Sequence, residues 1–113
     1  MTEYLDKKGL AYYTQSILNY SKFKIIKQTD TSVTIAPNVL NVWDNVEELN
    51  ISFKEGDPEE VCEYMIQFSC GDVPAKLSLP ENIKWSDEPE FESNHTYQIS
   101  ILNNLAIFAD WSN

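Results

Sequence analysis

The stretch from Leu79 to Trp111 places the strongest constraint on the fold, because apolar and polar side chains alternate along two neighbouring runs. Residues 97–101 read YQISI, the period-two pattern that is typical of a half-buried β-strand. The pair Asn103-Asn104 separates this run from a second one, LAIFADW. Asparagine tolerates the positive φ that a two-residue type I′ turn requires. The sequence therefore predicts a closing β-hairpin that reverses at these two asparagines.

Short runs rich in β-branched and aromatic residues recur upstream at spacings of roughly 8 to 12 residues, and Pro, Gly, Asn and Asp separate them. The runs cover residues 24–28, 32–35, 39–43, 47–53, 61–70, 76–79 and 83–85. Many short strands between turn residues are typical of a sandwich or a small barrel. We therefore predict a mainly β domain over residues 23–113, an antiparallel β-sandwich of jelly-roll or immunoglobulin-like type.

Residues 6–20, DKKGLAYYTQSILNY, form the one good helix candidate in the chain. Asp6 is a suitable N-cap. Four large side chains then follow at i, i+3, i+7 and i+10, which places them in one apolar stripe. These are Leu10, Tyr13, Ile17 and Tyr20. We predict that residues 1–22 are a helical anchor segment with this stripe as a candidate interface, together with Trp111 near the C-terminus.

The charge of the chain argues against a nucleic-acid partner. The net charge is −10 and there is no arginine, whereas phosphate binding requires a basic surface. In residues 1–27, five lysines oppose two acidic residues, which gives this segment +3 and leaves −13 for the remainder. A basic end on an acidic body suits docking onto an acidic partner. The alternative is ordinary scattered surface charge.

Membrane insertion and secretion are not expected either. No apolar run approaches the roughly 20 residues that a membrane-spanning helix needs. The N-terminal residues MTEYLDKKGL lack the apolar core of a signal peptide, so we expect synthesis in the cytoplasm.

Catalytic, cofactor and metal sites are not predicted. The single histidine, His95, has no Ser or Cys in a recognisable nucleophile motif, and we interpret it as a surface or strand-edge residue. The acidic loop 86–93 lacks the spacing and the central glycine of an EF-hand, so it is interpreted as solvated charge. Two cysteines and one histidine are too few for a structural zinc site. We therefore expect a protein that is not an enzyme.

Three tryptophans, Trp43, Trp85 and Trp111, are a sizeable set for 113 residues. Aromatic side chains dominate cores and protein interfaces, and they also stack on sugar rings. Core packing, subunit contact and glycan binding therefore all remain open for them. Trp111 lies at the end of a predicted edge strand, which favours subunit contact at that position.

Several stretches together resemble a group of tailed-bacteriophage virion proteins, the head-fibre, capsid-decoration and tail-associated modules of phages that infect gut bacteria. The N-terminal run YLDKKGLAYYTQSI is similar to the short anchor helix that opens many such proteins. The remainder resembles their compact β-domain. The matching stretches are VTIAPNVLNVW (33–43), EYMIQFSCGDVPAKLSLPENIKW (63–85) and TYQISILNNLAIFADW (96–111).

This resemblance implies a structural component of the virion, made in the bacterial cytoplasm, that docks through its N-terminal segment and displays a β-domain. The implied partners are other capsid or tail proteins and further copies of the chain, as a dimer or trimer. The alternative is a carbohydrate-binding module that attaches to host surface glycans. Neither reading involves nucleic acid, a membrane or a cofactor.

Overall fold

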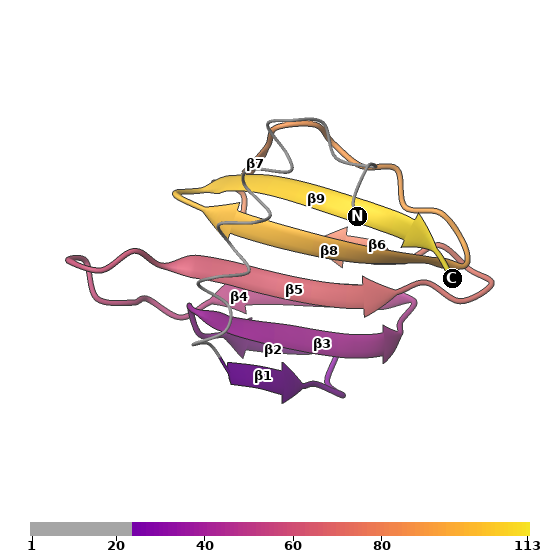
Figure 1. The fold of residues 1–113 in the computed structure, drawn as a ribbon, viewed down its shortest axis with the longest axis horizontal. Coiled ribbons are helices and arrows are strands. Elements are labelled where there is room, and N and C mark those ends of the chain that lie inside the picture. The colour runs from indigo at the N-terminus through magenta and orange to yellow at the C-terminus, as the bar shows by residue number, and fades with distance from the viewer. Residues whose placement is uncertain (1–23) are drawn as a thin grey trace.

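The computed structural model describes residues 24–113, which form nine β-strands arranged in two sheets (Figure 1). The strands are β1 (Lys24–Lys27), β2 (Ser32–Ile35), β3 (Val39–Asn45), β4 (Glu48–Phe53), β5 (Glu63–Ser69), β6 (Lys76–Ser78), β7 (Lys84–Trp85), β8 (His95–Leu102) and β9 (Leu105–Ser112). The described part of the chain is therefore mainly β. The predicted N-terminal helix, residues 6–20, lies outside the described residues.

The chain alternates between the two sheets along its first six strands. The larger sheet has the order β1-β3-β5-β8-β9-β7, and the smaller one has the order β2-β4-β6 and lies behind it in Figure 1. The strands that the chain adds one after another to the same sheet run in the same direction. In the larger sheet β1, β3 and β5 pair in parallel, and in the smaller sheet β2, β4 and β6 do so. Each short link therefore crosses from one sheet to the other.

The prediction that the sheets are antiparallel is wrong for the first half of the domain. Only the β5-β8 and β8-β9 pairs are antiparallel among the described strands, and β7 pairs with β9 in parallel. From the sequence, the short links were interpreted as turns within an antiparallel sandwich. Parallel neighbours normally require a long crossover, and here a strand of the opposite sheet provides it. Jelly-roll and immunoglobulin-like connectivity does not match this arrangement.

The closing hairpin is confirmed. Asn103 and Asn104 have φ values of 53° and 65°, as a type I′ turn requires. The register pairs Leu102 with Leu105 across the turn and continues as far as His95 opposite Ser112. β8 and β9 are thus the two longest described strands, and they extend the parallel half of the larger sheet with antiparallel pairs.

The link between β2 and β3 is fastened to the start of β5 by one asparagine. Pro37 interrupts the strand pattern, and Asn38 follows in the left-handed region with φ 61°. The backbone N–H of Asn38 donates to the carbonyl of Glu63 at 2.7 Å, and its Oδ1 accepts from the N–H of Glu63 at 3.0 Å. Its Nδ2 donates to the carbonyl of Val61 at 3.0 Å. Three hydrogen bonds thus hold the corner in place.

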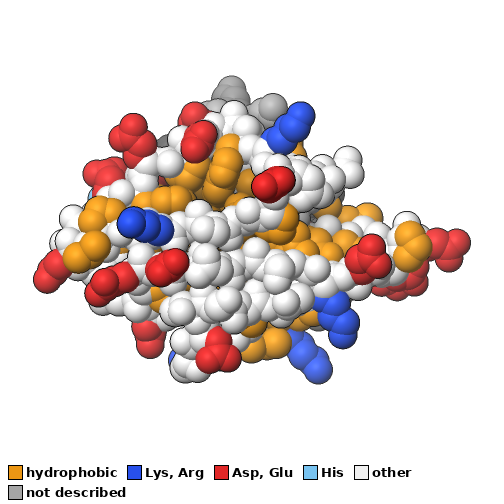
Figure 2. Space-filling view, turned by 180° about the vertical axis from the view of Figure 1, so that it is seen from behind, with side chains coloured by type: hydrophobic (Ala, Val, Ile, Leu, Met, Phe, Trp, Pro, Cys, Tyr) orange, Lys and Arg blue, Asp and Glu red, His pale blue; other side chains and the backbone are white. Residues whose placement is uncertain are grey.

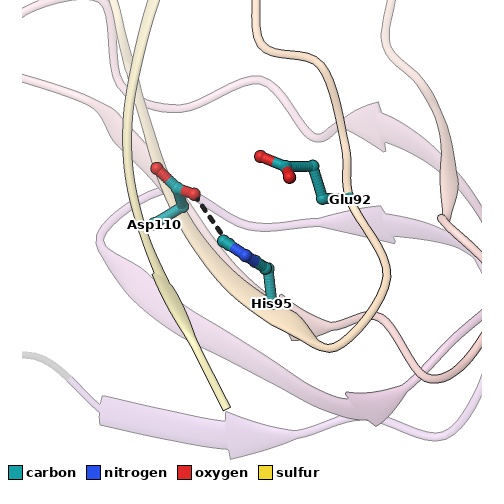
Figure 3. A group of neighbouring side chains, drawn as sticks. All are labelled: Glu92, His95 and Asp110. Carbon is teal, nitrogen blue, oxygen red and sulfur yellow. Dashed lines mark hydrogen bonds and ion pairs between the residues drawn. The ribbon is translucent and has the colours of Figure 1, made fainter.

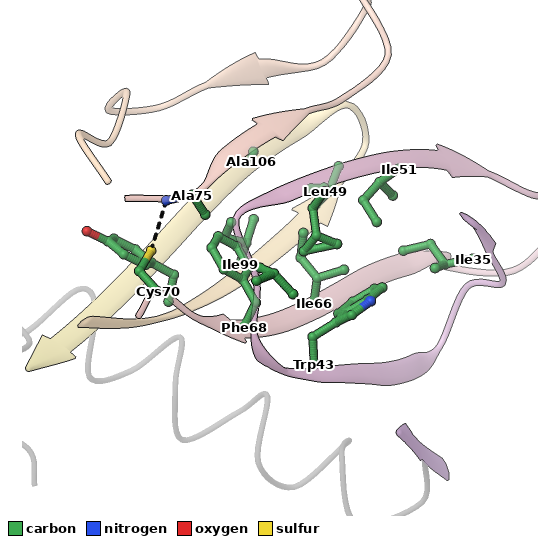
Figure 4. Close-up of a cluster of buried hydrophobic side chains, with 13 residues drawn as sticks. Ile35, Trp43, Leu49, Ile51, Ile66, Phe68, Cys70, Ala75, Ile99 and Ala106 are labelled. Atoms are coloured by element: carbon green, nitrogen blue, oxygen red, sulfur yellow. Dashed lines mark hydrogen bonds between the residues drawn. The ribbon is translucent and has the colours of Figure 1, made fainter. Parts of the chain in front are cut away.

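One hydrophobic core lies between the two sheets (Figure 4). Leu49 of the smaller sheet and Ile66 and Phe68 of the larger sheet have no exposed surface. Burying a side chain of this size contributes about 1.5–3 kcal/mol. The other buried members of the core are Ile35, Trp43, Val46, Ile51, Cys70, Ala75, Tyr97, Ile99, Ile101 and Ala106.

The predicted strand 61–70 was too long. β5 covers residues 63–69 and excludes Cys62 and Cys70, which lie just beyond its ends. Both cysteines are free thiols.

The outer face of the smaller sheet is polar. Figure 2 shows this side of the molecule, with acidic side chains around its periphery and mainly uncharged surface at its centre. Thr34 of β2 and Ser52 of β4 are neighbours there, and their hydroxyl oxygens lie 2.8 Å apart. Among residues 24–113 there is no helix of the length and apolarity needed to cross a lipid bilayer.

Candidate functional site

Four of the five predicted interface residues cannot be placed. Leu10, Tyr13, Ile17 and Tyr20 lie outside the described residues. The fifth, Trp111, lies on β9 opposite Thr96 of β8, and 43% of its surface is exposed. The other two tryptophans are engaged within the domain.

Trp43 is 2% exposed, and its Nε1 donates to the carbonyl of Asp30 at 2.7 Å. The Trp85 ring meets the Phe108 ring edge-on, with centroids 6.2 Å apart. Of the three roles left open for the tryptophans, core packing therefore describes these two.

The edge of the larger sheet at β1 carries apolar side chains that face solvent. Ile25 is 67% exposed and Ile26 is 42% exposed, although both belong to a strand that pairs with β3. Among the described strands, β3 is the only partner of β1, and the outer edge of a terminal strand can pair with an incoming strand. Lys24 and Lys27 stand at the two ends of the strand. We call residues 24–27 the β1 edge.

The structure does not bring Trp111 and the β1 edge together. Strands β3, β5 and β8 lie between β1 and β9 in the larger sheet. A partner that binds along the β1 edge of the sheet therefore does not contact Trp111 through the same edge. The exposed isoleucines were missed by the sequence interpretation, because the run KIIK was taken as an ordinary apolar-centred strand. Two adjacent isoleucines in a strand point to opposite faces, a pattern that favours a strand covered on both sides, so the sequence held no signal that β1 lies at an edge.

An open groove of 510 Å³ lies beside the turn of the closing hairpin. Phe53, Cys62 and Tyr64 form part of its lining, and the Phe53 and Tyr64 rings stack with centroids 4.4 Å apart. The Tyr64 hydroxyl donates to the carbonyl of Lys54 at 2.6 Å. Burial raises the pKa of the Tyr64 phenol, and the nearby Cys62 and Glu55 add to this effect. A tyrosine phenol is protonated at neutral pH in any case, so this rise in pKa matters only in alkaline solution.

A mixed cluster of ionisable side chains forms where β8 begins and β9 ends (Figure 3). Nδ1 of His95 lies 3.0 Å from Oδ2 of Asp110, and the carboxylate of Glu92 reaches the same place from the loop before β8. Exposure of the side chains is 24% for His95 and 33% for Asp110. We call these three residues the His95 cluster.

The Tyr97 side chain contacts both the loop that carries Glu92 and the ring of His95. Its hydroxyl accepts a hydrogen bond from the backbone N–H of Glu92 at 2.7 Å and donates one to the carbonyl of Glu90 at 3.1 Å. Its ring lies 6.2 Å from the imidazole of His95, with 30° between the ring planes. Burial raises the pKa of the Tyr97 phenol. The hydrogen bond from Glu92 opposes this rise, and the charge of Asp110 adds to it.

The imidazole of His95 contacts the carboxylate of Asp110 and the ring of Tyr97. Comparisons with protein-family models, with curated proteins and with solved structures found no match. The interpretation of function therefore depends on the surfaces described above and on the sequence resemblance.

Proposed function

We propose that this chain is a non-enzymatic structural protein of a bacteriophage virion, a head-fibre or capsid-associated appendage. Residues 1–22 dock it onto the particle, and the two-sheet body is displayed outward. Three stretches of the β-domain and one of the N-terminal segment carry the sequence resemblance that motivates the proposal. The mainly β architecture of residues 24–113 is compatible with it.

The single observation that carries the proposal is the β1 edge. It begins directly after the predicted anchor segment and presents Ile25 and Ile26 with 67% and 42% of their surfaces exposed. An open strand edge with apolar side chains is a template for pairing with another chain. The short length of β1 and its two lysines limit unspecific pairing at this edge. We propose that a second copy of the chain covers it in a dimer or trimer.

Charge favours this occupant. Lys24 and Lys27 flank the two isoleucines, whereas residues 28–113 carry a net charge of −13. A basic strand on one copy therefore meets an acidic body on the next, and charge complementarity of this kind increases the rate and the specificity of association. Because surface charges are screened over about 8–10 Å at physiological salt, the association should weaken as salt is raised.

Virion incorporation is the direct test of the location. Particles assembled with the full chain should retain it through density-gradient purification, with detection by mass spectrometry. Particles assembled with a variant that lacks residues 1–22 should lack it, while circular dichroism of that variant retains the β signal. Equal incorporation of the two forms would contradict docking through the N-terminal segment. Absence of the full chain from purified particles would contradict the virion assignment itself.

A second candidate is binding to host surface glycans, and the exposure of Trp111 favours it. This indole is the most accessible of the three tryptophans, because Trp43 is buried and Trp85 packs against Phe108. Tryptophan faces stack on sugar rings. A titration with host surface polysaccharide should quench the fluorescence of the wild type in a saturable way and leave a Trp111→Phe variant unaffected. No saturable quenching would remove this candidate.

A further inference from the structure

The His95 cluster joins two parts of the sequence, residues 92–95 and Asp110. Glu92 belongs to the loop between β7 and β8, His95 is the first residue of β8, and Asp110 lies near the end of β9. One ligand atom from each lies within 4.8 Å of the other two. Figure 3 shows the three side chains converging on one place at the end of the hairpin. Glu92 and His95 are close in the sequence, whereas Asp110 lies 15 positions beyond His95 and is brought to them by the β8-β9 pairing.

The backbone around the cluster is held in place. In the β8-β9 register, Tyr97 opposes Asp110, so His95 and Asp110 are diagonal neighbours on the same face of the sheet. The Tyr97 hydroxyl holds the loop through its hydrogen bonds to the backbone of Glu90 and Glu92. The positions of all three ligand-bearing residues are therefore set by the core and by the strand pairing.

We propose that Glu92, His95 and Asp110 form a binding site for a divalent transition-metal ion, with Zn²⁺ as the best match. One imidazole nitrogen and two carboxylate oxygens are a ligand set suited to zinc and its first-row neighbours. Calcium takes six to eight oxygen ligands, and both calcium and magnesium prefer oxygen to an imidazole nitrogen. Three protein ligands leave a fourth tetrahedral position for water, as in sites of this ligand number.

The distances fit this metal. Bonds of about 2.1 Å in a tetrahedral site place ligand atoms about 3.4 Å apart. Nδ1 of His95 and Oδ2 of Asp110 are 3.0 Å apart in a hydrogen bond, so a metal held by both atoms replaces the shared proton and requires only a small increase in their separation. The exposed Glu92 side chain rotates to close the remaining separation, which is at most 4.8 Å. The overall charge of −10 also attracts cations to the protein surface.

A metal ion at this position would fasten the loop 86–94 to the closing hairpin. It would link β8, β9 and the loop in addition to the hydrogen bonds of Tyr97. Because binding to the folded state stabilises it by mass action, saturation with metal raises the thermal midpoint of unfolding. The proposal is independent of the β1 edge, which belongs to the opposite part of the larger sheet.

The test titrates the full chain with ZnCl₂ alone. Calorimetry measures the stoichiometry and affinity, and NMR measures the shifts of the imidazole resonances. His95 is the sole histidine of the sequence, so its ring resonances are assigned without ambiguity. We expect one zinc per chain, saturable shifts of these resonances and a higher thermal midpoint. Glu92→Gln changes an exposed side chain and should weaken zinc binding at least tenfold, as should His95→Gln. Glu88→Gln is the matched control, because it removes the same charge from the same loop outside the cluster.

A wild type that shows no saturable shift of the imidazole up to 1 mM zinc, on the order of the weakest sites in proteins, would overturn the proposal. Equal weakening by Glu92→Gln and Glu88→Gln would also overturn it, because it would indicate diffuse attraction to acidic surface. Zinc binding that survives His95→Gln unchanged would place the metal elsewhere. All of these proteins also carry Cys62→Ala, because the half-buried free thiol of Cys62 would otherwise compete for zinc.

Discussion

The indole Nε1 of Trp43 donates a hydrogen bond to the backbone carbonyl of Asp30, at 2.7 Å. This contact ties the core strand β3 to the link between β1 and β2, through a side chain that is only 2% exposed. The link is one of the short crossings between sheets, so the bond helps to set the path of the chain at the β1 edge.

Trp43→Phe should lower the free energy of unfolding by about 2 kcal/mol, because it removes this hydrogen bond and part of the core volume. Urea unfolding followed by circular dichroism measures the change. Trp111→Phe is the matched control, since the same chemical change at a 43% exposed position should cost less than about 0.5 kcal/mol. Equal midpoints for the two variants would contradict the role of Trp43.

The corner at Asn38 gives a second prediction. Asn38→Gly retains the freedom to adopt φ 61° but loses the side-chain bonds to Val61 and Glu63, and should cost about 1–2 kcal/mol. Asn38→Ala loses the same bonds and adds the cost of a positive φ, about 1 kcal/mol more. Urea unfolding of both variants gives the order. A less stable glycine variant would show that backbone conformation contributes little at this corner.

The turn of the closing hairpin gives a third prediction, in the stabilising direction. Asn104 has φ 65°, a conformation that glycine adopts without steric cost. Asn104→Gly should therefore raise the free energy of unfolding by up to about 1 kcal/mol, and with it the thermal midpoint. Asn104→Val should lower both. The ranking Gly, Asn, Val in a thermal melt is the expected result. A valine variant as stable as the wild type would contradict the assigned turn geometry.

A fourth prediction concerns alkaline pH and Tyr64. Its pKa is raised in the folded state, mainly by burial, above an ordinary value of about 10. The folded state therefore holds the phenolic proton more tightly than the unfolded state does. The resulting stabilisation is complete below pH 10 and is lost as pH rises through the folded pKa.

Tyr64→Phe should consequently make the decline of unfolding free energy above pH 10 shallower. Urea unfolding at closely spaced pH values measures the two slopes. Tyr97 also has a raised pKa and is present in both proteins, so a residual slope remains. Identical slopes for the wild type and the variant would contradict the assignment to Tyr64.

The local elements of the fold could be predicted from the sequence because each has a short-range signal. Alternation and an asparagine pair are enough to predict β8, β9 and their turn, and the structure has all three. The sheet in which each strand lies has no such signal. A link of two to four residues can return the chain to its neighbour or send it to the opposite sheet. At Asn38, contacts with Val61 and Glu63 decide between these outcomes, and those residues are more than 20 positions away.

The candidate sites were less predictable for the same reason. His95 and Asp110 are 15 positions apart, and the β8-β9 register brings them together. The sequence interpretation predicted the hairpin correctly, but it did not use the register of the hairpin to identify which side chains are neighbours. Ile25 and Ile26 are exposed because β1 lies at a sheet edge, and edge position follows from the order of strands in the sheet.

The solution mass of the full chain, measured by light scattering after gel filtration, tests the central proposal most directly. One chain has a mass of 13.0 kDa. The double variant Ile25→Lys, Ile26→Lys places charge on the β1 edge, and Val61→Lys, Val73→Lys is the matched control because it makes the same charge change at two other exposed apolar residues. We predict a dimer or trimer for the wild type and the control, and a monomer for the β1-edge variant. A monomeric wild type, or an oligomer that survives the β1-edge variant, would contradict the proposal that a second copy covers this edge.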